Sequence, residues 1–262
     1  MIRRSSFYYD AVEEVDDGVR KAIVSIAEEF PAYGYRMIAA ELNRRLFTVN
    51  AKRVRRLMRE DNLVIQVRRY VTTSTCSRDR RDWPNLLKNK ELSNLNEVWS
   101  ADITYIDLGR EFVYLAVIID VFSRGIRGWY LGSDLSSELT HHALDRALSK
   151  HGSPAIHHSD HGVQYLSEGY LEKLASHGIA VSCSAKGKPT QNGKCERFIR
   201  TLKESEVYLN EYEDLAEARR RIRKFLEDVY MTRRIHSALD YVTPAEFEES
   251  CRAKLKRKLK VS

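Results

Sequence analysis

Cysteine is scarce in this sequence and has no regular spacing. The four cysteines, Cys76, Cys183, Cys195 and Cys251, form no CxxC or CxxH pattern, so the sequence predicts neither a disulfide framework nor a cysteine-based zinc site. Long apolar runs are also lacking. No stretch approaches the ~18 apolar residues of a membrane span, and the start "MIRRSSFYYD" has no apolar signal-peptide segment. These absences predict a cytoplasmic protein with reduced thiols and no membrane partner.

Positive charge is in moderate excess. The 262 residues include 44 Lys and Arg against 37 Asp and Glu, giving a formal charge of +7 and a pI near 9.2. This balance favours a polyanionic partner, with nucleic acid ahead of a membrane surface. The length fits one large domain, or a medium domain with a smaller companion.

Helical periodicity dominates the start of the chain. Apolar residues at steps of three and four predict helices over residues 11–30, 35–46 and 51–62, and Asn50 is a good N-cap for the third. That third helix has cations that its apolar stripe leaves facing outward: Lys52, Arg53, Arg55, Arg56 and Arg59. Few acidic residues stand at i+4 to pair with them. Residues 1–67 are therefore predicted to form a helix-turn-helix-like DNA-binding domain.

The pattern changes twice further along. Residues 68–95 lack periodicity and are polar and basic, as in a linker. From Val98 the segments "VWSADITYIDL", "EFVYLAVIIDVFS" and "GIRGWYLGS" are rich in β-branched and aromatic residues, which predicts three antiparallel strands. Short strands then alternate with helices. Residues 96–212 are thus predicted to form a mixed α/β sheet covered on both faces, followed by a basic helical region over 213–262.

Three carboxylates stand where such a sheet gathers ligands. Asp102 lies in the first strand, Asp160 ends the short strand "AIHHSD", and Glu196 follows the loop "KGKPTQNG" in the first turn of a helix. They converge at one edge if the first and fourth strands are neighbours. Carboxylates with retained waters and substrate phosphates suit Mg²⁺.

At these residues the sequence resembles a known family. "WSADITYI", "HHSDHGVQY" and "GKPTQNGKCERFIRTLK" look like the acidic triad of DDE transposases and retroviral-type integrases, and the 35 residues between Asp160 and Glu196 match that family's spacing. "YGYRMIAAEL", "KRVRRLMRE" and "RRIHSALDYVTPAEF" look like the second-reading-frame (OrfB) part of transposases of the IS-three bacterial insertion-sequence family. The resemblance spans about residues 33–248.

The resemblance implies a fold, an activity and partners. It implies an RNase H-like core with a five-stranded sheet, in which Asp102, Asp160 and Glu196 are the catalytic ligands of two Mg²⁺ ions, with Mn²⁺ as a substitute. The implied activity is 3′-end cleavage and strand transfer on double-stranded DNA, namely transposon ends and target. The implied assembly is a homodimer or larger oligomer at the bacterial nucleoid. An upstream-frame protein is a further candidate partner, because the chain starts close to the OrfB region.

Residues around Glu196 are expected to contact DNA. Arg200 and Lys203 follow it at i+4 and i+7, on the same helix face. The full set of expected contacts near the triad is Lys186, Lys188, Gln191, Asn192, Arg200 and Lys203. For Asn192 a role in loop geometry is an equal alternative.

The histidine-rich stretch "HHSDHGVQY" is not predicted to bind zinc. His157 and His158 alternate within a strand, so they point to opposite faces and cannot both join His161 on one ion. Asp160 is the expected ligand there. His161, Gln164 and Tyr165 are expected to line the DNA-facing rim.

Two other functions compete with transposition. The first is a non-catalytic regulator that occupies transposon ends, which a test of metal dependence would distinguish. The second is a tyrosine recombinase, suggested by Arg233, His236 and Tyr241. That mechanism needs further arginines in a helical catalytic domain, whereas this segment follows a mixed sheet.

Overall fold

The computed structural model describes residues 12–63, 83–88, 90–185 and 189–259. They divide into two compact units. One contains the described residues before 64 together with Ile235–Tyr241, and the other contains the described residues from 83 to Arg234 and from Val242 to 259. Most of the predicted basic linker lies outside the described residues.

The first unit is helical. It contains α1 (Val12–Glu29), α2 (Tyr35–Arg44) and α3 (Ala51–Glu60), which confirms the helices expected from periodicity. Asn50 caps α3, because its side-chain oxygen accepts the N–H of Arg53 at 2.8 Å. The core of the unit is formed by the apolar stripes of the three helices, with Val19, Ile23, Ile26, Ile38, Leu42, Val54 and Leu57 all buried.

A segment from much later in the chain belongs to the same unit. Ile235–Tyr241 includes the short helix η5 (Ser237–Leu239). Ile235 is fully buried, and its N–H donates to the hydroxyl of Tyr33 at 2.9 Å. Leu239 is also buried. The helical unit is therefore built from two stretches that are distant in sequence.

The second unit contains a five-stranded sheet of order β3-β2-β1-β4-β5. Its first three strands are antiparallel neighbours, as predicted. β1 pairs with β4 in parallel, and β4 pairs with β5 in parallel. The condition placed on the three carboxylates, that the first and fourth strands be neighbours, is therefore met. The strand bounds are β1 (Val98–Asp107), β2 (Phe112–Asp120), β3 (Ile126–Gly132), β4 (Ile156–Ser159) and β5 (Ala180–Cys183).

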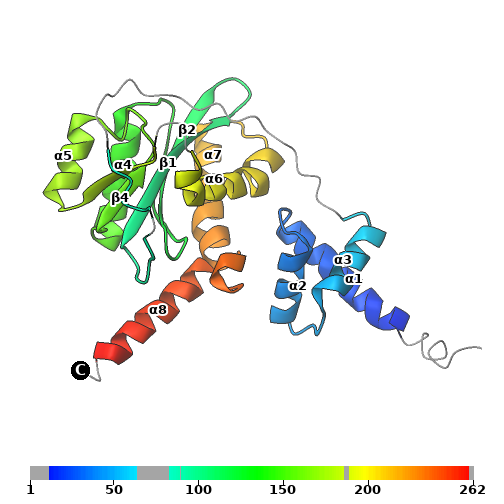
Figure 1. Ribbon diagram of the computed structural model, residues 1–262. Coiled ribbons are helices and arrows are strands. Elements are labelled where there is room, and N and C mark those ends of the chain that lie inside the picture. Colours follow the sequence, from blue (N-terminus) through cyan, green and yellow to red (C-terminus); the bar gives the residue numbers. More distant parts are fainter. Residues whose placement is uncertain (1–11, 64–82, 89, 186–188, 260–262) are drawn as a thin grey trace, which may run out of the picture. The chain divides into compact units, whose positions relative to one another are not determined.

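Helices cover both faces of this sheet (Figure 1). α4 (Ser137–His151) and α5 (Glu168–Ser176) bury one face through a cluster that includes Trp99, Ala116 and Tyr170. α6 (Gly193–Ser205) and α7 (Leu215–Lys224) bury the other through a cluster that includes Val117, Phe198 and Ile222. The mixed α/β fold with a covered five-stranded sheet is thereby confirmed.

The remaining elements are short turns and one final helix. A π-helical turn, η4 (Phe225–Tyr230), continues α7, and α8 (Pro244–Leu259) ends the described chain. The 3₁₀ turns η2 (Pro189–Asn192) and η3 (Val207–Leu209) flank α6. Among the described helices, none has the length and hydropathy needed to cross a membrane.

Candidate active site

Strand register brings Asp102 and Asp160 to the same level of the sheet. Trp99 pairs with His157 and Ser100 with His158 along the parallel β1–β4 pair. Continuing this register by two residues places Asp102 opposite Asp160, just past the end of β4. Because side chains alternate along a strand, Asp102 shares its face of β1 with Ser100 and Ile106, and Ile106 belongs to the core beneath α6.

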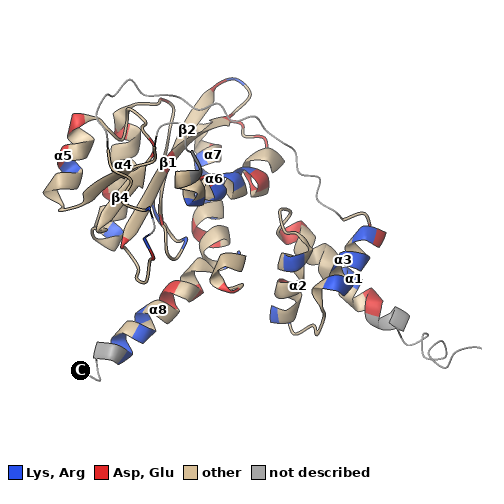
Figure 2. Ribbon diagram, in the orientation of Figure 1, with Lys and Arg blue, Asp and Glu red and all other residues tan. Residues whose placement is uncertain are grey.

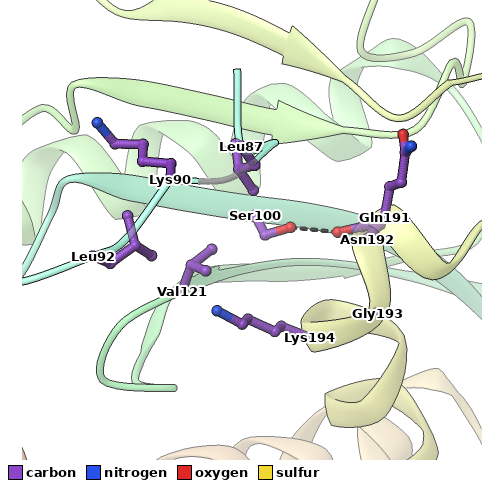
Figure 3. Close-up of a pocket in the computed structure, with 9 residues that line it drawn as sticks. All are labelled: Leu87, Lys90, Leu92, Ser100, Val121, Gln191, Asn192, Gly193 and Lys194. Carbon is purple, nitrogen blue, oxygen red and sulfur yellow. Dashed lines mark hydrogen bonds between the residues drawn. The ribbon is translucent and has the colours of Figure 1, made fainter. Parts of the chain in front are cut away.

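Glu196 reaches this region because α6 is fixed on the sheet. Cys195, Phe198 and Leu202 of α6 are buried in the core, which leaves Glu196 half-buried at the side of the helix. The amide of Asn192, immediately before α6, donates to the carbonyl of Ala101 at 3.1 Å. The hydroxyl of Ser100 donates to the same side chain, as Figure 3 shows. Asn192 thus ties the start of the glutamate helix to the strand that carries Asp102.

The three carboxylates influence one another electrostatically. Burial raises the pKa of Asp102 to about 8, and repulsion from Asp160 and Glu196 acts in the same direction. Burial also raises the pKa of Asp160. The pKa of Glu196 is raised by burial and by the charge of Asp160. The arrangement therefore concentrates negative charge that an added cation would neutralise.

The donor chemistry of the site fits a hard divalent cation. One oxygen of Asp102 accepts the N–H of Ile103 at 2.8 Å, and one oxygen of Asp160 accepts the N–H of Gly162 at 2.9 Å. The second oxygen of each carboxylate makes no hydrogen bond to any residue that the structure describes. Among those same residues, however, no three His, Cys, Asp or Glu side chains are already gathered around one point as ligands. The carboxylates are close enough to interact, and Mg²⁺ typically needs only one or two of them plus water and phosphate oxygens.

Cations from α6 flank the carboxylates. Lys203 lies 4.4 Å from the centre of the Tyr105 ring. Burial lowers the pKa of Lys203, while the charge of Asp102 partly opposes that shift. Arg200 is exposed, and its charge favours the ionised form of Glu196. Both predicted cations thus accompany the triad in the structure.

The surface is hollowed beside Ser100 and Asn192. A pocket of about 300 Å³ lies between the segment that precedes β1 and the start of α6 (Figure 3). Lys90 and Lys194 line it together with apolar side chains. The complete lining is Leu87, Lys90, Leu92, Ser100, Val121, Gln191, Asn192, Gly193 and Lys194.

Comparison with known proteins identifies the family. Integrase core domain models match residues 93–189 and 177–244, and an HTH-like domain model matches residues 14–70. The transposase for insertion sequence element IS904 of Lactococcus lactis subsp. lactis (strain IL1403) is 37% identical over 83% of this chain and 87% of that protein. The chain belongs to the insertion-sequence transposase family.

Further relatives agree with this assignment. Transposase InsF for insertion sequence IS3A of Escherichia coli (strain K12) is 30% identical over 82% of this chain and 76% of its own length. The cryo-EM structure of the simian T-cell lymphotropic virus intasome in complex with PP2A regulatory subunit B56 gamma is 15% identical, with a TM-score of 0.50 over 86% of this chain and 74% of that one. This last likeness concerns the fold alone. Membership places the chain among enzymes that cut and join DNA, and it confirms the resemblance drawn from the motifs.

His157 and His158 have structural roles in the core. His157 Nε2 lies 2.9 Å from the hydroxyl of Tyr170, and burial lowers the pKa of His157 to about 3. His158 Nδ1 lies 2.9 Å from the hydroxyl of Ser182, and burial lowers its pKa to about 4. Both rings are therefore neutral at pH 7 and turned toward different neighbours in the core.

The expectation that Tyr165 lines a DNA-facing rim is wrong. Its side chain is only 3% exposed, because its ring packs at 5.6 Å from that of Tyr170 and 6.1 Å from that of His157. Its hydroxyl is buried and makes no hydrogen bond within the described residues. His161 and Gln164 stay half-buried at the surface. Periodicity gave no signal for Tyr165, since the segment after β4 is irregular.

The expected DNA-contacting residues fall into different environments. Lys186 and Lys188 lie outside the described residues. Gln191 is half-buried, and its side-chain oxygen accepts from Asn85 at 2.8 Å. Asn192 is only 4% exposed, so the structure supports its alternative role in loop geometry and does not place it on the surface.

The basic helix α3 is also less free than its sequence indicated. The guanidinium of Arg53 lies 2.6 Å from the carboxylate of Asp16, and that of Arg56 lies 3.1 Å from the same group. These ion pairs join α3 to α1, whereas the sequence pattern gives only the acidic residues at i+4 on α3 itself. Arg55 stacks on the ring of Tyr35 at 5.4 Å. Lys52, Arg55 and Arg59 are exposed, and Figure 2 shows basic residues along α3.

Proposed function

We propose that this chain is a DDE-type transposase that cleaves the 3′ ends of an insertion sequence and joins them to target DNA by phosphoryl transfer. The observation that carries the proposal is the grouping of Asp102, Asp160 and Glu196, in which the charges of Asp160 and Glu196 raise the pKa of Asp102 and the charge of Asp160 raises the pKa of Glu196. Family membership supports the same chemistry. Asp102, Asp160 and Glu196 are the proposed catalytic residues.

The same three residues are the proposed ligands of two Mg²⁺ ions, for which Mn²⁺ would substitute. When bound, these ions would supply activation of the attacking oxygen and stabilisation of the leaving oxygen. The protein contributes the position of the ligands. Asp160 follows the end of β4, and the parallel register of β1 and β4, continued by two residues, sets it opposite Asp102. The Asn192 contacts hold α6 against β1.

Cations around the triad are proposed to hold the DNA backbone. Arg200 and Lys203 accompany Glu196 on α6 and would neutralise the phosphates next to the reacting one. In the helical unit, Lys52, Arg55 and Arg59 are exposed cations of α3 that, unlike Arg53 and Arg56, are not paired with Asp16, and they would bind transposon-end DNA. We assign Lys186, Lys188 and Gln191 secondary contacts from the loop before α6.

The proposed partners are double-stranded DNA and a second copy of the chain. A transposase that joins two ends to one target must hold both ends at once, which a homodimer or larger oligomer achieves. An upstream-frame protein is a third proposed partner. Mass measurement of the DNA-bound species tests the oligomer, since a single active protomer on DNA would contradict it.

The decisive experiment is cleavage and joining of DNA that carries the element's own ends, in Mg²⁺ or in EDTA. Wild type is compared with Glu196→Gln, and the matched control is Glu204→Gln on the same helix. We expect metal-dependent products with wild type and the control, and none with Glu196→Gln. Tight binding without products in Mg²⁺ or Mn²⁺ would instead indicate a regulator that occupies transposon ends.

A further inference from the structure

The first half of α8 is held firmly against the sheet unit. Glu248 is 3% exposed, and its Oε1 accepts from the hydroxyl of Ser123 at 2.7 Å and from the guanidinium of Arg127 at 2.7 Å. Arg127 also pairs with buried Asp120 at 3.2 Å. At the start of the helix, Thr243 and Glu246 exchange hydrogen bonds in a capping box. The direction in which α8 leaves the sheet is therefore fixed by buried polar contacts.

The second half of the same helix is exposed and positively charged. Every residue from Arg252 to Arg257 is exposed, and α8 extends away from the sheet (Figure 1). The segment, which we call the basic arm, contains Arg252, Lys254, Lys256 and Arg257 and no acidic residue. Figure 2 shows these cations along the outer part of the helix.

The protein itself does not neutralise this charge. Arg252 pairs with Glu248 at 2.8 Å, whereas Lys254, Lys256 and Arg257 form no ion pair with any described residue. Arg252 and Lys256 stand four apart, and Lys254 and Arg257 stand three apart, and like charges at such spacings face each other and destabilise a helix. The helix dipole accounts for cations in the last turn only. Because the helix is held in place and its cations repel one another, an external polyanion that neutralised them would be bound favourably.

We propose that the basic arm binds the phosphate backbone of double-stranded DNA outside the cleavage site. The proposal rests on the proposed function for the identity of the polyanion as DNA. The cations are spread over more than one face of the helix, and contacts to phosphates carry no sequence information. The contribution of the arm is therefore independent of DNA sequence and sensitive to salt.

The test uses the full chain in EDTA, so that binding is measured without cleavage. The triple variant Lys254→Gln, Lys256→Gln, Arg257→Gln keeps good helix-forming residues. Fluorescence anisotropy measures affinity for a transposon-end duplex and for an unrelated duplex between about 50 and about 200 mM salt. We expect about tenfold weaker binding to both. The slope of log affinity against log salt concentration is negative, and it should become less steep by roughly 0.9 for each phosphate contact that is removed.

The matched control removes three exposed cations elsewhere on the sheet unit, Arg110, Lys150 and Lys224, so the net charge changes equally. The proposal is overturned if the triple variant keeps the wild-type salt slope, or if the control loses as much affinity. It is also overturned if the variant changes only the mass of the free protein, since the arm would then be a self-association surface. If DNA binding depends on the arm but no metal-dependent cleavage is found, the proposed function is refuted and the proposal for the basic arm stands.

Discussion

Replacing Tyr165 with phenylalanine would test whether its buried hydroxyl serves the carboxylate site. A β-carbon added to Gly162 would lie 2.9 Å from an Asp160 oxygen and 3.5 Å from a Tyr165 ring carbon. The Tyr165 ring and the Asp160 carboxylate are therefore close to each other, next to Gly162. Burial raises the pKa of Tyr165 well above its ordinary value, with contributions from Tyr170, Asp102 and Asp160. A buried hydroxyl without a partner costs about 1–3 kcal/mol. Such a cost is explained if the hydroxyl gains a partner when metal binds.

The expected signature is opposite changes in stability and metal affinity. Tyr165→Phe keeps the ring contacts and removes the unpaired oxygen, so in EDTA its free energy of unfolding should rise by up to about 1–3 kcal/mol. That corresponds to a rise in Tm of about 2–12 °C, at roughly 2–4 °C per kcal/mol. Its affinity for Mn²⁺ should fall about tenfold, the lower end of what groups behind metal ligands contribute.

Differential scanning fluorimetry in EDTA and calorimetric titration with Mn²⁺ measure the two quantities. Tyr170→Phe is the control, because it removes a hydroxyl that is already bonded to His157 and should lower Tm. If Tyr165→Phe lowers Tm in EDTA, or binds Mn²⁺ as wild type does, the reasoning is refuted.

Two further predictions concern the elements that surround the triad. Asn192→Ala removes two contacts to β1 and should cost about 2–4 kcal/mol in urea unfolding, with at least a tenfold loss of end cleavage because Glu196 is no longer aligned. Cleavage at the wild-type rate would show that the clamp is dispensable. His157 is neutral when folded, with a pKa lowered from 6.5 to about 3, so its stabilising contribution is present above pH 6.5 and is lost as pH falls toward 3. Near pH 5 the loss is roughly 2 kcal/mol, at ~1.4 kcal/mol per pH unit. His157→Gln should flatten the dependence of the urea midpoint on pH over that interval, and an unchanged dependence would contradict the assignment.

Local pattern predicted most of the secondary structure. The helices of the first unit and the antiparallel strands follow from periodicities of 3.6 and 2. The catalytic role of the three carboxylates stays a prediction that comes from the family resemblance. Contacts between distant segments could not be predicted this way. The pairing of Arg53 with Asp16 joins two helices, and the inward position of Tyr165 depends on packing against α5. A single sequence gives no direct information about which distant surfaces meet.

The helical unit includes a segment from late in the chain, so it cannot be completed early in synthesis. Its first helices leave the ribosome early, but the segment that carries Ile235 follows more than 160 residues after the described part of the unit ends at residue 63. At synthesis rates of about 5–20 residues per second, the interval is on the order of ten seconds or more. During that time the surface around Tyr33 lacks its native cover. A nascent or prematurely terminated chain therefore presents an incomplete helical unit, and the native helical unit forms only on chains whose synthesis has passed Tyr241.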